Sequence, residues 1–304
     1  MPCYHPISAV VQGTTPNGKQ NIAFSRKTHL YPKHKQLQLP CGQCIGCRLE
    51  RSRQWAVRVI HEASTCEHNC FITLTFNDEN LNPNLSLDKP KGSRFQKFMK
   101  RLRKKYHPKP IRFIHCGEYG EKLDRPHHHA CLFNHDFKDK ELLRENQGVK
   151  LYTSETLQKL WPYGYSTIGD VTFDSASYVA RYITKKINGA LAKDHYKGKI
   201  AEYITMSRRP GLGKAWYDQY KDTDVYNRDE IIIRDNIKCK PPKYYDSLYE
   251  LDNPEKIITI KDIRKAKAQR SLDNTQARLN IREQVKLSKF KQLKRSYENE
   301  TSSI

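Results

Sequence analysis

The spacing of apolar and polar positions divides the middle of the chain into alternating strands and helices. The run Phe71–Phe76 is β-branched and aromatic, which predicts a strand that ends at Asn77-Asp78. Similar short apolar runs predict three more strands, at residues 111–116, 127–133 and 165–171.

Two stretches of the chain have the apolar periodicity of helices. Ser93 is a suitable N-cap for a helix that runs to about Tyr106. Its apolar stripe consists of Phe95, Phe98, Met99, Leu102 and Tyr106. Asp174 can cap a second helix, from about Ser175 to Ile187. The order of elements predicts an α+β core, in which a central antiparallel sheet has helices packed on one face.

The regions outside this core have a different composition. Residues 1–70 hold six of the nine cysteines, and we expect a Cys-rich N-terminal element with a basic helix. The core is expected to occupy residues 71–215. Residues 216–304 are expected to form a basic C-terminal region that is partly helical or disordered, because Lys and Arg far outnumber Asp and Glu after residue 256.

The charge of the chain narrows the choice of partner. The sequence has 55 Lys and Arg against 33 Asp and Glu, a formal net charge of +22. So large an excess predicts a polyanionic partner, either nucleic acid or an anionic membrane surface. The mean hydropathy is −0.85, and no apolar run approaches the roughly 20 residues of a membrane span. We therefore expect nucleic acid and no membrane, and the first residues lack the layout of a signal peptide.

The segment Pro126–Phe133 contains three consecutive histidines. On a strand, His127 and His129 point to one face and His128 points to the other. Two imidazoles one pleat apart suit a divalent metal, and Glu118 at the end of the preceding strand would be the third ligand if the chain returns antiparallel. Two His and one carboxylate leave coordination positions open for a substrate oxygen. The alternative is three solvent-facing histidines at a strand end.

The segment YVARYITKK, residues 178–186, places two tyrosines on one side of a helix. At 100° per residue the expected buried stripe is Ala176, Val179, Ala180, Ile183 and Ile187. Tyr178, Tyr182 and Lys185 lie on the opposite side, and the two phenols are about 6 Å apart. A phenol has a pKa of about 10, so it needs a metal-polarised phosphate or a nearby cation to act as a nucleophile. The pattern indicates two nucleophiles that take turns; the alternative is a solvated helix face.

The spacing of Cys41, Cys44 and Cys47 is C-x2-C-x2-C, which is typical of metal ligands. Cys3 is the first choice for a fourth ligand, and the alternatives are His5, Cys66 and Cys70. An odd number of cysteines without an export signal disfavours a disulfide framework. We expect structural Zn²⁺ rather than an iron–sulfur cluster, because no redox partner site is evident; the alternative is three free cysteines.

Several basic side chains are candidates for DNA contacts. Some follow the cysteines on the expected basic helix, others lie on the polar faces of the helix after Ser93, and two lie near the tyrosines. The expected DNA-binding residues are Arg48, Arg51, Arg53, Lys97, Lys100, Arg101, Lys104, Arg181 and Lys186.

Three segments occur in this order along the chain: the strand FITLTF (71–76), the H-x-H strand (127–133) and the helix YVARYITKK (178–186). Together they resemble the three motifs of HUH-superfamily rolling-circle replication initiators. The paired tyrosines resemble the two-tyrosine type found in isometric single-stranded-DNA phages. Three further blocks are similar to the replication initiation protein of gokushovirus-type microviruses: PCGQCIGCRLERSRQWAVR (40–58), CGEYG (116–120) and MSRRPGLG (206–213). The resemblance covers roughly residues 1–215.

The resemblance implies an HUH endonuclease core with an RRM or ferredoxin-like arrangement. His127 and His129 match the metal-binding pair, and Glu118 matches the strand-end carboxylate, which together would hold Mg²⁺ or Mn²⁺. Tyr178 and Tyr182 match the nucleophiles. Lys185 matches the lysine of that motif, with Lys186 as its nearest rival. The middle residue of H-x-H is usually bulky and apolar, whereas here it is His128.

The activity that the resemblance implies is metal-dependent nicking and rejoining of phage DNA. One tyrosine would cut the double-stranded origin at a locally single-stranded segment, becoming joined to the 5′ phosphate. A host polymerase would extend the free 3′ hydroxyl while a host helicase displaces the old strand. The second tyrosine would cut the regenerated origin and allow a single-stranded circle to close. This would take place in the cytoplasm of the host bacterium.

Three other functions remain open from the sequence. One is a non-catalytic, zinc-containing nucleic-acid-binding protein, which gives the H-x-H strand and the tyrosines no role. Another is a metallohydrolase with an H-x-H-x-D-H motif, but Ala130 and Cys131 stand where the Asp would be needed. The third is a transposase or relaxase of the same chemistry that uses a single tyrosine.

Overall fold

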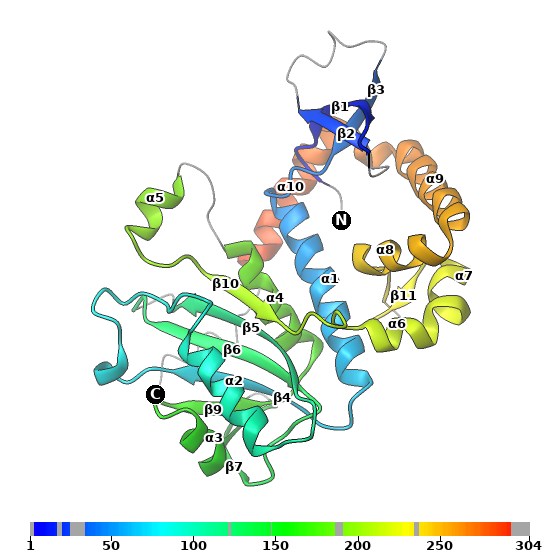
Figure 1. Ribbon diagram of the computed structural model, residues 1–304. Coiled ribbons are helices and arrows are strands. Elements are labelled where there is room, and N and C mark those ends of the chain that lie inside the picture. The colour runs from blue at the N-terminus through cyan, green and yellow to red at the C-terminus, as the bar shows by residue number, and fades with distance from the viewer. Residues whose placement is uncertain are drawn as a thin grey trace. The chain divides into compact units, whose positions relative to one another are not determined.

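In the computed structural model the described residues are 3–16, 20–24, 34–120, 123–146, 148–185, 191–233 and 237–292, and for 181–185 and 191 only the backbone is described. Figure 1 shows the order of the elements along the chain. The chain divides into two compact units. The larger consists of residues 51–260 with 295–304, and the smaller of residues 1–50 with 261–294.

A seven-stranded antiparallel sheet forms the centre of the larger unit, in the order β10-β5-β6-β4-β9-β8-β7. This confirms the predicted α+β class with a central antiparallel sheet. The strands are β4 (Asn69–Thr75), β5 (Arg112–Tyr119), β6 (Pro126–Phe133), β7 (Lys140–Asn146), β8 (Val149–Ser154), β9 (Ser166–Gly169) and β10 (Tyr203–Met206).

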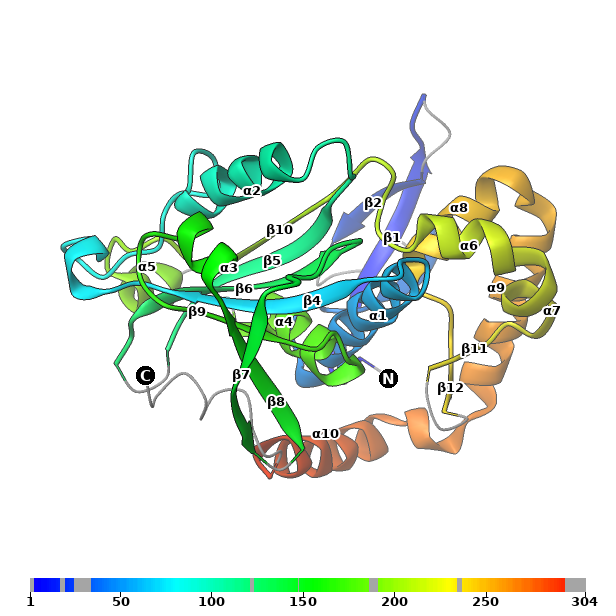
Figure 2. The same ribbon diagram turned by 90° about the horizontal axis from the view of Figure 1, so that it is seen from below.

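Helices cover both faces of this sheet, not one face as predicted (Figure 2). One face packs against α2 (Arg94–Lys105) and α3 (Glu155–Leu160). The other packs against α4 (Phe173–Lys185) and the part of α1 (Ile45–Ser64) that lies in this unit. The reason is that the central strands are buried on both sides: all eight residues of β6 are buried.

The two helices predicted in this core begin with different caps. The Ser93 hydroxyl accepts a hydrogen bond from the backbone N–H of Gln96, which confirms Ser93 as the cap of α2. In α4 the expected cap, Asp174, is wrong. Thr172 and Ser175 instead exchange reciprocal side-chain-to-backbone hydrogen bonds, an arrangement like a capping box. The helix therefore begins two residues earlier than predicted.

The rest of the larger unit is helical and rich in tyrosine. Tyr217, Tyr245 and Tyr249 form a second core with Val57 and Ile257. The remaining elements of the larger unit are α5 (Leu191–Tyr196), α6 (Lys214–Tyr220), a π-helical turn η3 (Lys221–Val225), α7 (Tyr226–Arg228), β11 (Ile231–Ile232), β12 (Lys238–Cys239), α8 (Lys243–Asp252) and the first part of α9 (Pro254–Arg270). A 3₁₀ turn, η2 (Asp78–Asn80), follows β4.

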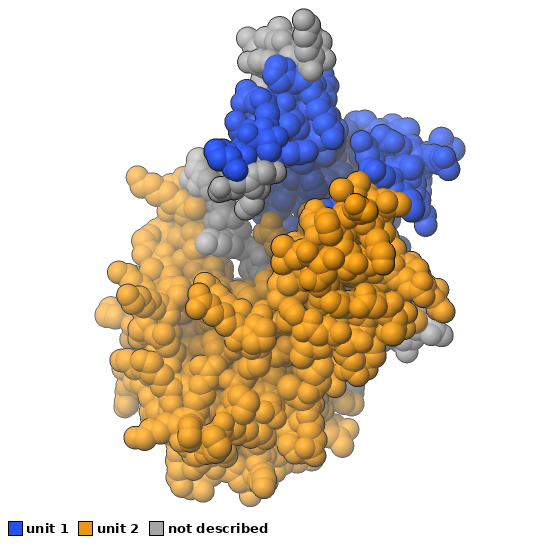
Figure 3. All heavy atoms as spheres, turned by 45° about the vertical axis from the view of Figure 1, so that its right-hand side comes forward, with its two compact units in different colours: residues 1–50, 261–294 blue, residues 51–260, 295–304 orange. Residues whose placement is uncertain are grey.

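The smaller unit combines residues 1–50 with residues 261–294 (Figure 3, blue). Its three-stranded sheet, in the order β2-β1-β3, is formed by β1 (Ile7–Thr14), β2 (Gln20–Phe24) and β3 (Lys35–Leu39). From the C-terminal region come the end of α9, the 3₁₀ turn η4 (Leu272–Asn274) and α10 (Gln276–Lys291). Leu279 of α10 is buried with Tyr4 and Cys44.

Within the described part of the chain, no helix combines the length and the apolar character that crossing a lipid bilayer requires.

Candidate metal centre and tyrosine site

The turn between β5 and β6 brings Glu118 to the paired histidines. The antiparallel register sets Glu118 opposite His127 and Cys116 opposite His129. Oε1 of Glu118 lies 3.0 Å from Nε2 of His127 and 2.8 Å from Nε2 of His129. All three side chains are buried, and one ligand atom of each lies within 4.8 Å of the others. The three donors therefore converge on one point, as the spacing predicted.

Hydrogen bonds on the outer nitrogens orient both imidazole rings. Nδ1 of His127 lies 3.1 Å from the carbonyl oxygen of Arg125, which can only accept. Nδ1 of His129 lies 2.9 Å from Oγ1 of Thr73, its cross-strand neighbour on β4. With the Nδ1 atoms engaged, the Nε2 atoms of both rings face Glu118. Such outer partners fix the tautomer and direction of metal-binding histidines in general.

Strand β4 and the residues after it also hold the Arg125 carbonyl in place. The Arg125 guanidinium contacts Oδ1 of Asp78 at 2.6 Å and donates to the carbonyl oxygen of Phe76 at 3.0 Å. Strand β4 thus supports the ring of His129 directly through Thr73, and the residues after β4 support that of His127 through Arg125.

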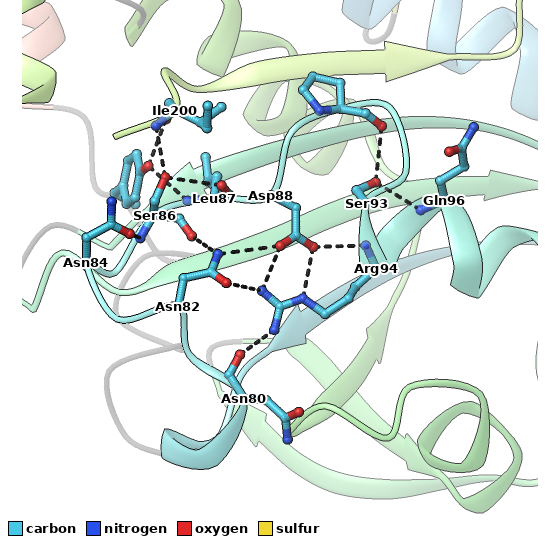
Figure 4. Close-up of polar contacts among 12 residues, drawn as sticks. Asn80, Asn82, Asn84, Ser86, Leu87, Asp88, Ser93, Arg94, Gln96 and Ile200 are labelled. Atoms are coloured by element: carbon cyan, nitrogen blue, oxygen red, sulfur yellow. Dashed lines mark hydrogen bonds and ion pairs between the residues drawn. The ribbon is translucent and has the colours of Figure 1, made fainter. Parts of the chain in front are cut away.

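The segment that follows Asp78 forms a polar network (Figure 4). Arg94 donates to both carboxylate oxygens of Asp88, and this pair lowers the pKa of Asp88 to about 2, although burial alone would raise it. In the same segment the backbone N–H of Leu87 donates to the hydroxyl of Tyr119, which donates to the carbonyl of Ile200. These bonds anchor the end of β5, next to Glu118.

Glu118 is a charged carboxylate in a dry site. Burial would by itself raise its pKa, but the contacts with His127 and His129 lower the pKa to about 2. A buried carboxylate that stays ionised beside two imidazole nitrogens is a donor set that suits a divalent cation. The residues present therefore fit a metal centre of the His-His-carboxylate kind.

Tyr178 of α4 reaches this centre. Its hydroxyl lies 3.4 Å from Oε1 of Glu118, and its ring packs edge-on against His129 at 5.1 Å between ring centres. The side chain is only 2% exposed and belongs to the core between α4 and the sheet. The prediction that Tyr178 lies opposite the buried stripe is therefore wrong. The sheet face is broad enough to bury Ser175 and Tyr178 in addition to the stripe residues Ala176, Val179 and Ala180.

The other predicted residues of this helix lie outside what is described. The backbone of α4 includes Tyr182, Lys185 and Arg181, but their side chains are not among the described ones, and Lys186 lies beyond the described residues.

His128 faces the opposite side of the sheet, as predicted. It is fully buried, and its Nδ1 lies 3.1 Å from Nε2 of His115. Burial lowers the pKa of His128 to about 3 and that of His115 well below its usual value, so both are neutral. The alternative of three solvent-facing histidines is thus contradicted. His128 packs among Phe76, Phe95 and Trp161, which is the apolar surrounding expected for this position of the motif.

In the smaller unit, Cys3 joins Cys41, Cys44 and Cys47 to form a second cluster. The sulfurs of Cys41 and Cys47, and those of Cys44 and Cys3, are 4.0 Å apart. A tetrahedron with Zn–S bonds of about 2.3 Å has edges of about 3.8 Å, so the four thiols fit Zn²⁺. All nine cysteines are free. The alternative ligand His5 instead pairs with Glu283 at 2.6 Å.

Backbone N–H groups point at the sulfurs of this cluster. The N–H of Tyr4 donates to Cys44 Sγ, that of Cys41 to Cys3 Sγ, and that of Cys44 to Cys41 Sγ. Burial alone would raise the pKa of Cys44, but the hydrogen bond from the Tyr4 N–H, with further bonds from Cys47 and Cys41, lowers this pKa to about 7. Such bonds stabilise thiolates, which are the form that binds metal.

The structure places the expected DNA-binding residues in different surroundings. On α2, Lys97, Lys100 and Lys104 are exposed, but they lie on the sheet face opposite the histidine pair. Arg101 donates to the carbonyl of Leu160, so it has a structural contact. The remaining described ones are Arg48, which donates to Gln43; Arg53, which donates to the carbonyl of Lys240; and Arg51, which is exposed.

Sequence reasoning missed Thr73 and Arg125. A signal for Thr73 was present, because Thr73 and Thr75 alternate on β4 as His127 and His129 do on β6, and cross-strand pairing matches the two sets. Nothing in the sequence marked Arg125, because its backbone carbonyl, not its side chain, contacts the histidine.

Comparison with known proteins places this site in a family. The family model of the replication-associated protein ORF2/G2P matches residues 69–187, which include β4, the H-x-H strand and Tyr178. The replication-associated protein VP4 of Bdellovibrio phage phiMH2K is 34% identical over 265 residues, 84% of this chain and 79% of that protein.

Two further relatives agree. The replication-associated protein ORF2 of Spiroplasma virus 4 is 36% identical, over 77% of this chain and 75% of that protein. ORF4 of Chlamydia phage 1, also a replication-associated protein, is 35% identical, over 71% of this chain and 54% of that protein. No solved structure matches the chain. The chain therefore belongs to the family of phage replication-associated proteins, which confirms the resemblance to phage replication initiators that its motifs suggest.

Proposed function

We propose that this replication-associated protein is a metal-dependent endonuclease and strand transferase that nicks phage origin DNA and rejoins the displaced strand into circles. The observation that carries the proposal is the meeting of Tyr178 Oη, at 3.4 Å, with the carboxylate that the two imidazoles share. Core packing alone does not require a phenol beside a His-His-carboxylate donor set. Phosphoryl transfer would use the phenol as a nucleophile and the donor set as a metal site.

In this proposal Glu118, His127 and His129 hold Mg²⁺ or Mn²⁺. The cation would supply charge neutralisation at the non-bridging oxygens of the scissile phosphate. Thr73 and Arg125 keep the imidazoles aimed, so the ligands need little reorganisation when DNA arrives.

Tyr178 is the proposed nucleophile for one of two cleavage steps. Its oxygen forms a bond to phosphorus while the bond to the 3′ oxygen breaks, which gives a 5′-phosphotyrosine and a free 3′ hydroxyl. Tyr182 is proposed for the second step and Lys185 as the cation that stabilises phenolate. Because Tyr178 is buried, the phosphate reaches its hydroxyl only if DNA binding opens the contact between α4 and the sheet.

The remaining partners follow from this activity. We propose that the protein acts on double-stranded and single-stranded phage DNA at the origin, together with a host helicase and DNA polymerase in the bacterial cytoplasm. The exposed Lys97, Lys100 and Lys104 contribute phosphate contacts, with Arg48, Arg51, Arg53, Arg101, Arg181 and Lys186 as the other proposed DNA-binding residues. The four cysteines of the smaller unit are proposed to hold structural Zn²⁺.

Nicking of supercoiled phage origin DNA in the presence of Mn²⁺ tests this proposal. We expect the wild-type protein to convert supercoiled to open circles. Glu118→Gln and His127→Ala should abolish nicking while largely sparing DNA binding, because they remove metal ligands only. A His127→Ala protein that still nicks at the wild-type rate would refute the metal role.

Substitution of each tyrosine separates the two-tyrosine cycle from its alternatives. If both take part, Tyr178→Phe and Tyr182→Phe should each lose a different step, and one single variant should still cleave without rejoining. Full activity with only one tyrosine would favour a single-tyrosine transposase or relaxase. Binding without any nicking by the wild-type protein would favour a non-catalytic nucleic-acid binder.

A further inference from the structure

Tyr165 stands out among the aromatic side chains of the larger unit. Its side chain is 57% exposed, and among the described side chains of this unit no other Phe, Trp or Tyr is exposed. Exposure of a large aromatic ring to water is unfavourable, and a binding role is one reason for it. Single exposed rings are nevertheless common on protein surfaces, so exposure alone does not assign such a role. The position of Tyr165 in the sheet supplies the second observation.

Cross-strand register places Tyr165 in the same row as the candidate metal ligands. Glu118 of β5 pairs with His127 of β6, which pairs with Thr75 of β4. The N–H of Thr75 donates to the carbonyl oxygen of Tyr165, directly before β9, at 2.8 Å. Four neighbouring chain segments thus contribute Glu118, His127, Thr75 and Tyr165 in that order.

Tyr165 directly precedes β9, and continuing the alternation of that strand assigns its side chain to the face that carries the candidate metal ligands. Thr167, two residues later on β9, pairs with Thr73, which contacts His129 on this face. Side chains alternate along a strand, so Tyr165 and Thr167 share a face. Two strand spacings of about 4.8 Å put the backbone of Tyr165 about 10 Å from that of His127. A few nucleotides of a single strand cover this length.

The backbone beneath the ring is held firmly. Thr75 bonds the Tyr165 carbonyl through both its N–H and its hydroxyl. Gln158 donates to the carbonyl of Gly164 and accepts from the hydroxyl of Ser166, the residues on either side. The ring therefore projects from a fixed position, and binding would cost little backbone entropy.

We propose that Tyr165 is a stacking platform for a base of single-stranded DNA close to the scissile phosphate. This rests on the proposed nuclease function and adds a residue that positions the substrate strand. Exposed aromatic rings bind single strands by stacking on the bases, which tolerates any base. The ring would orient the strand so that a phosphate next to the stacked base enters the row that ends at Glu118.

The test is the affinity for a fluorescein-labelled oligothymidine of about 20 nucleotides, measured by anisotropy in EDTA so that no cleavage occurs. Tyr165→Ala should bind roughly 5- to 100-fold more weakly than the wild type, the range of one base–aromatic stack. Tyr165→Phe and Tyr165→Trp keep a ring and should bind like the wild type. Phe24→Ala, which removes an exposed ring from the smaller unit, is the matched control and should change nothing.

A second measurement reports base stacking directly, in the wild type and in Tyr165→Ala. An oligothymidine with one 2-aminopurine should lose fluorescence on binding, and Tyr165→Ala should reduce this quenching. Unchanged affinity and unchanged quenching in Tyr165→Ala would overturn the proposal, as would equal losses in Tyr165→Phe, which would implicate the hydroxyl. Nicking is scored separately. If the wild type nicks DNA and Tyr165→Ala binds the oligonucleotide normally, only the stacking proposal is refuted. If Tyr165→Ala binds more weakly but the wild type does not nick, only the nuclease proposal is refuted.

Discussion

The hydroxyl of Thr73 decides which nitrogen of His129 faces Glu118. It lies 2.9 Å from Nδ1 of His129 and is almost fully buried, so water cannot easily replace it. The centre therefore depends on a residue that carries no charge and cannot itself bind the substrate from where it lies.

We predict that Thr73→Val weakens Mn²⁺ binding by about 10- to 100-fold, the usual cost of losing an outer hydrogen bond to a metal-binding histidine. Thr73→Ser keeps the hydroxyl and should restore most of the affinity. Isothermal titration with Mn²⁺ measures both variants, and melting curves check that they are folded. Equal affinity for Thr73→Val and wild type would show that the bond has no role in metal binding.

At the residue scale, the sequence predicted the convergence of Glu118, His127 and His129 better than it predicted the position of Tyr178. Alternation along one strand is enough to pair His127 with His129, and a short turn is enough to add Glu118. A helical wheel gives the angle between Tyr178 and its neighbours, but the width of the buried arc depends on the surface against which α4 packs. That surface, with Phe71 and His129 on it, comes from distant parts of the chain.

Among the elements, the end of β4 and the turn before β9 approach each other closely at Gly164. A Cβ at Gly164 would meet the Thr75 carbonyl at 2.4 Å and the Asn77 nitrogen at 2.6 Å. Both are backbone atoms, which cannot rotate away. The strand that supports the ring of His129 is thus packed directly against this glycine.

Gly164→Ala should therefore lower the free energy of unfolding by about 2 kcal/mol or more, because the two segments must separate. Urea unfolding is the measurement. Gly169→Ala on β9 is the control: its added Cβ would meet its nearest neighbour at 3.7 Å, an ordinary contact, so a small change is expected. Similar losses in the two variants would argue against the steric explanation.

Helix α1 contains a buried histidine that should make the protein sensitive to acid. Nδ1 of His61 lies 2.9 Å from the Tyr245 hydroxyl, and its ring stacks on Trp216. Burial lowers the pKa of His61 to about 3, whereas in the unfolded chain it is about 6.5. The unfolded state therefore binds an extra proton between these values. The stability that His61 contributes is complete above about pH 6.5 and is lost as the pH falls toward 3.

His61→Gln should flatten the dependence of stability on pH. One such group contributes at most about 1.4 kcal/mol per pH unit within this window. Urea unfolding at pH 7 and pH 5 should show that the variant, although less stable at pH 7, loses less on acidification than the wild type. If the two proteins lose the same amount, His61 is not neutral in the folded state.

Some elements were visible in the sequence and others were not. The apolar runs of β4, β5, β6 and β9 predicted four central strands, since burial on both faces leaves a continuous signal. Strand β7 has mostly exposed residues, so it lacks the alternation of a half-buried strand. It is a strand because it pairs with β8, and pairing at the edge of a sheet leaves little trace in composition.

At the scale of the whole molecule, the Cys cluster holds together the smaller unit from two distant parts of the sequence. Tyr4, Cys44 and Leu279 form one buried cluster, against which Cys3 packs, so α10 packs on the segment that supplies the candidate ligands. Composition alone suggested a tail for this region, because α10 is mostly polar and only Leu279 is buried in it.

Removal of the metal should therefore release α10. In hydrogen exchange, a strong chelator or Cys44→Ser should abolish amide protection in α10 and in β1–β3, because metal binding and folding are coupled in small metal-bound units. The strands β4, β5 and β6 have their own core and should stay protected. Persistent protection of α10 after the zinc content has fallen to zero would contradict a structural role for the metal.

The account as a whole depends on a phenol that becomes joined to DNA beside a His-His-carboxylate centre. The most direct test is to trap the protein on a single-stranded origin oligonucleotide with Mn²⁺, digest the complex and sequence the cross-linked peptide by mass spectrometry. We predict a 5′-phosphotyrosine on Tyr178 or Tyr182 that requires Mn²⁺ and is absent in His127→Ala. A covalent link to any other residue, or a link that forms equally without His127, would contradict the account.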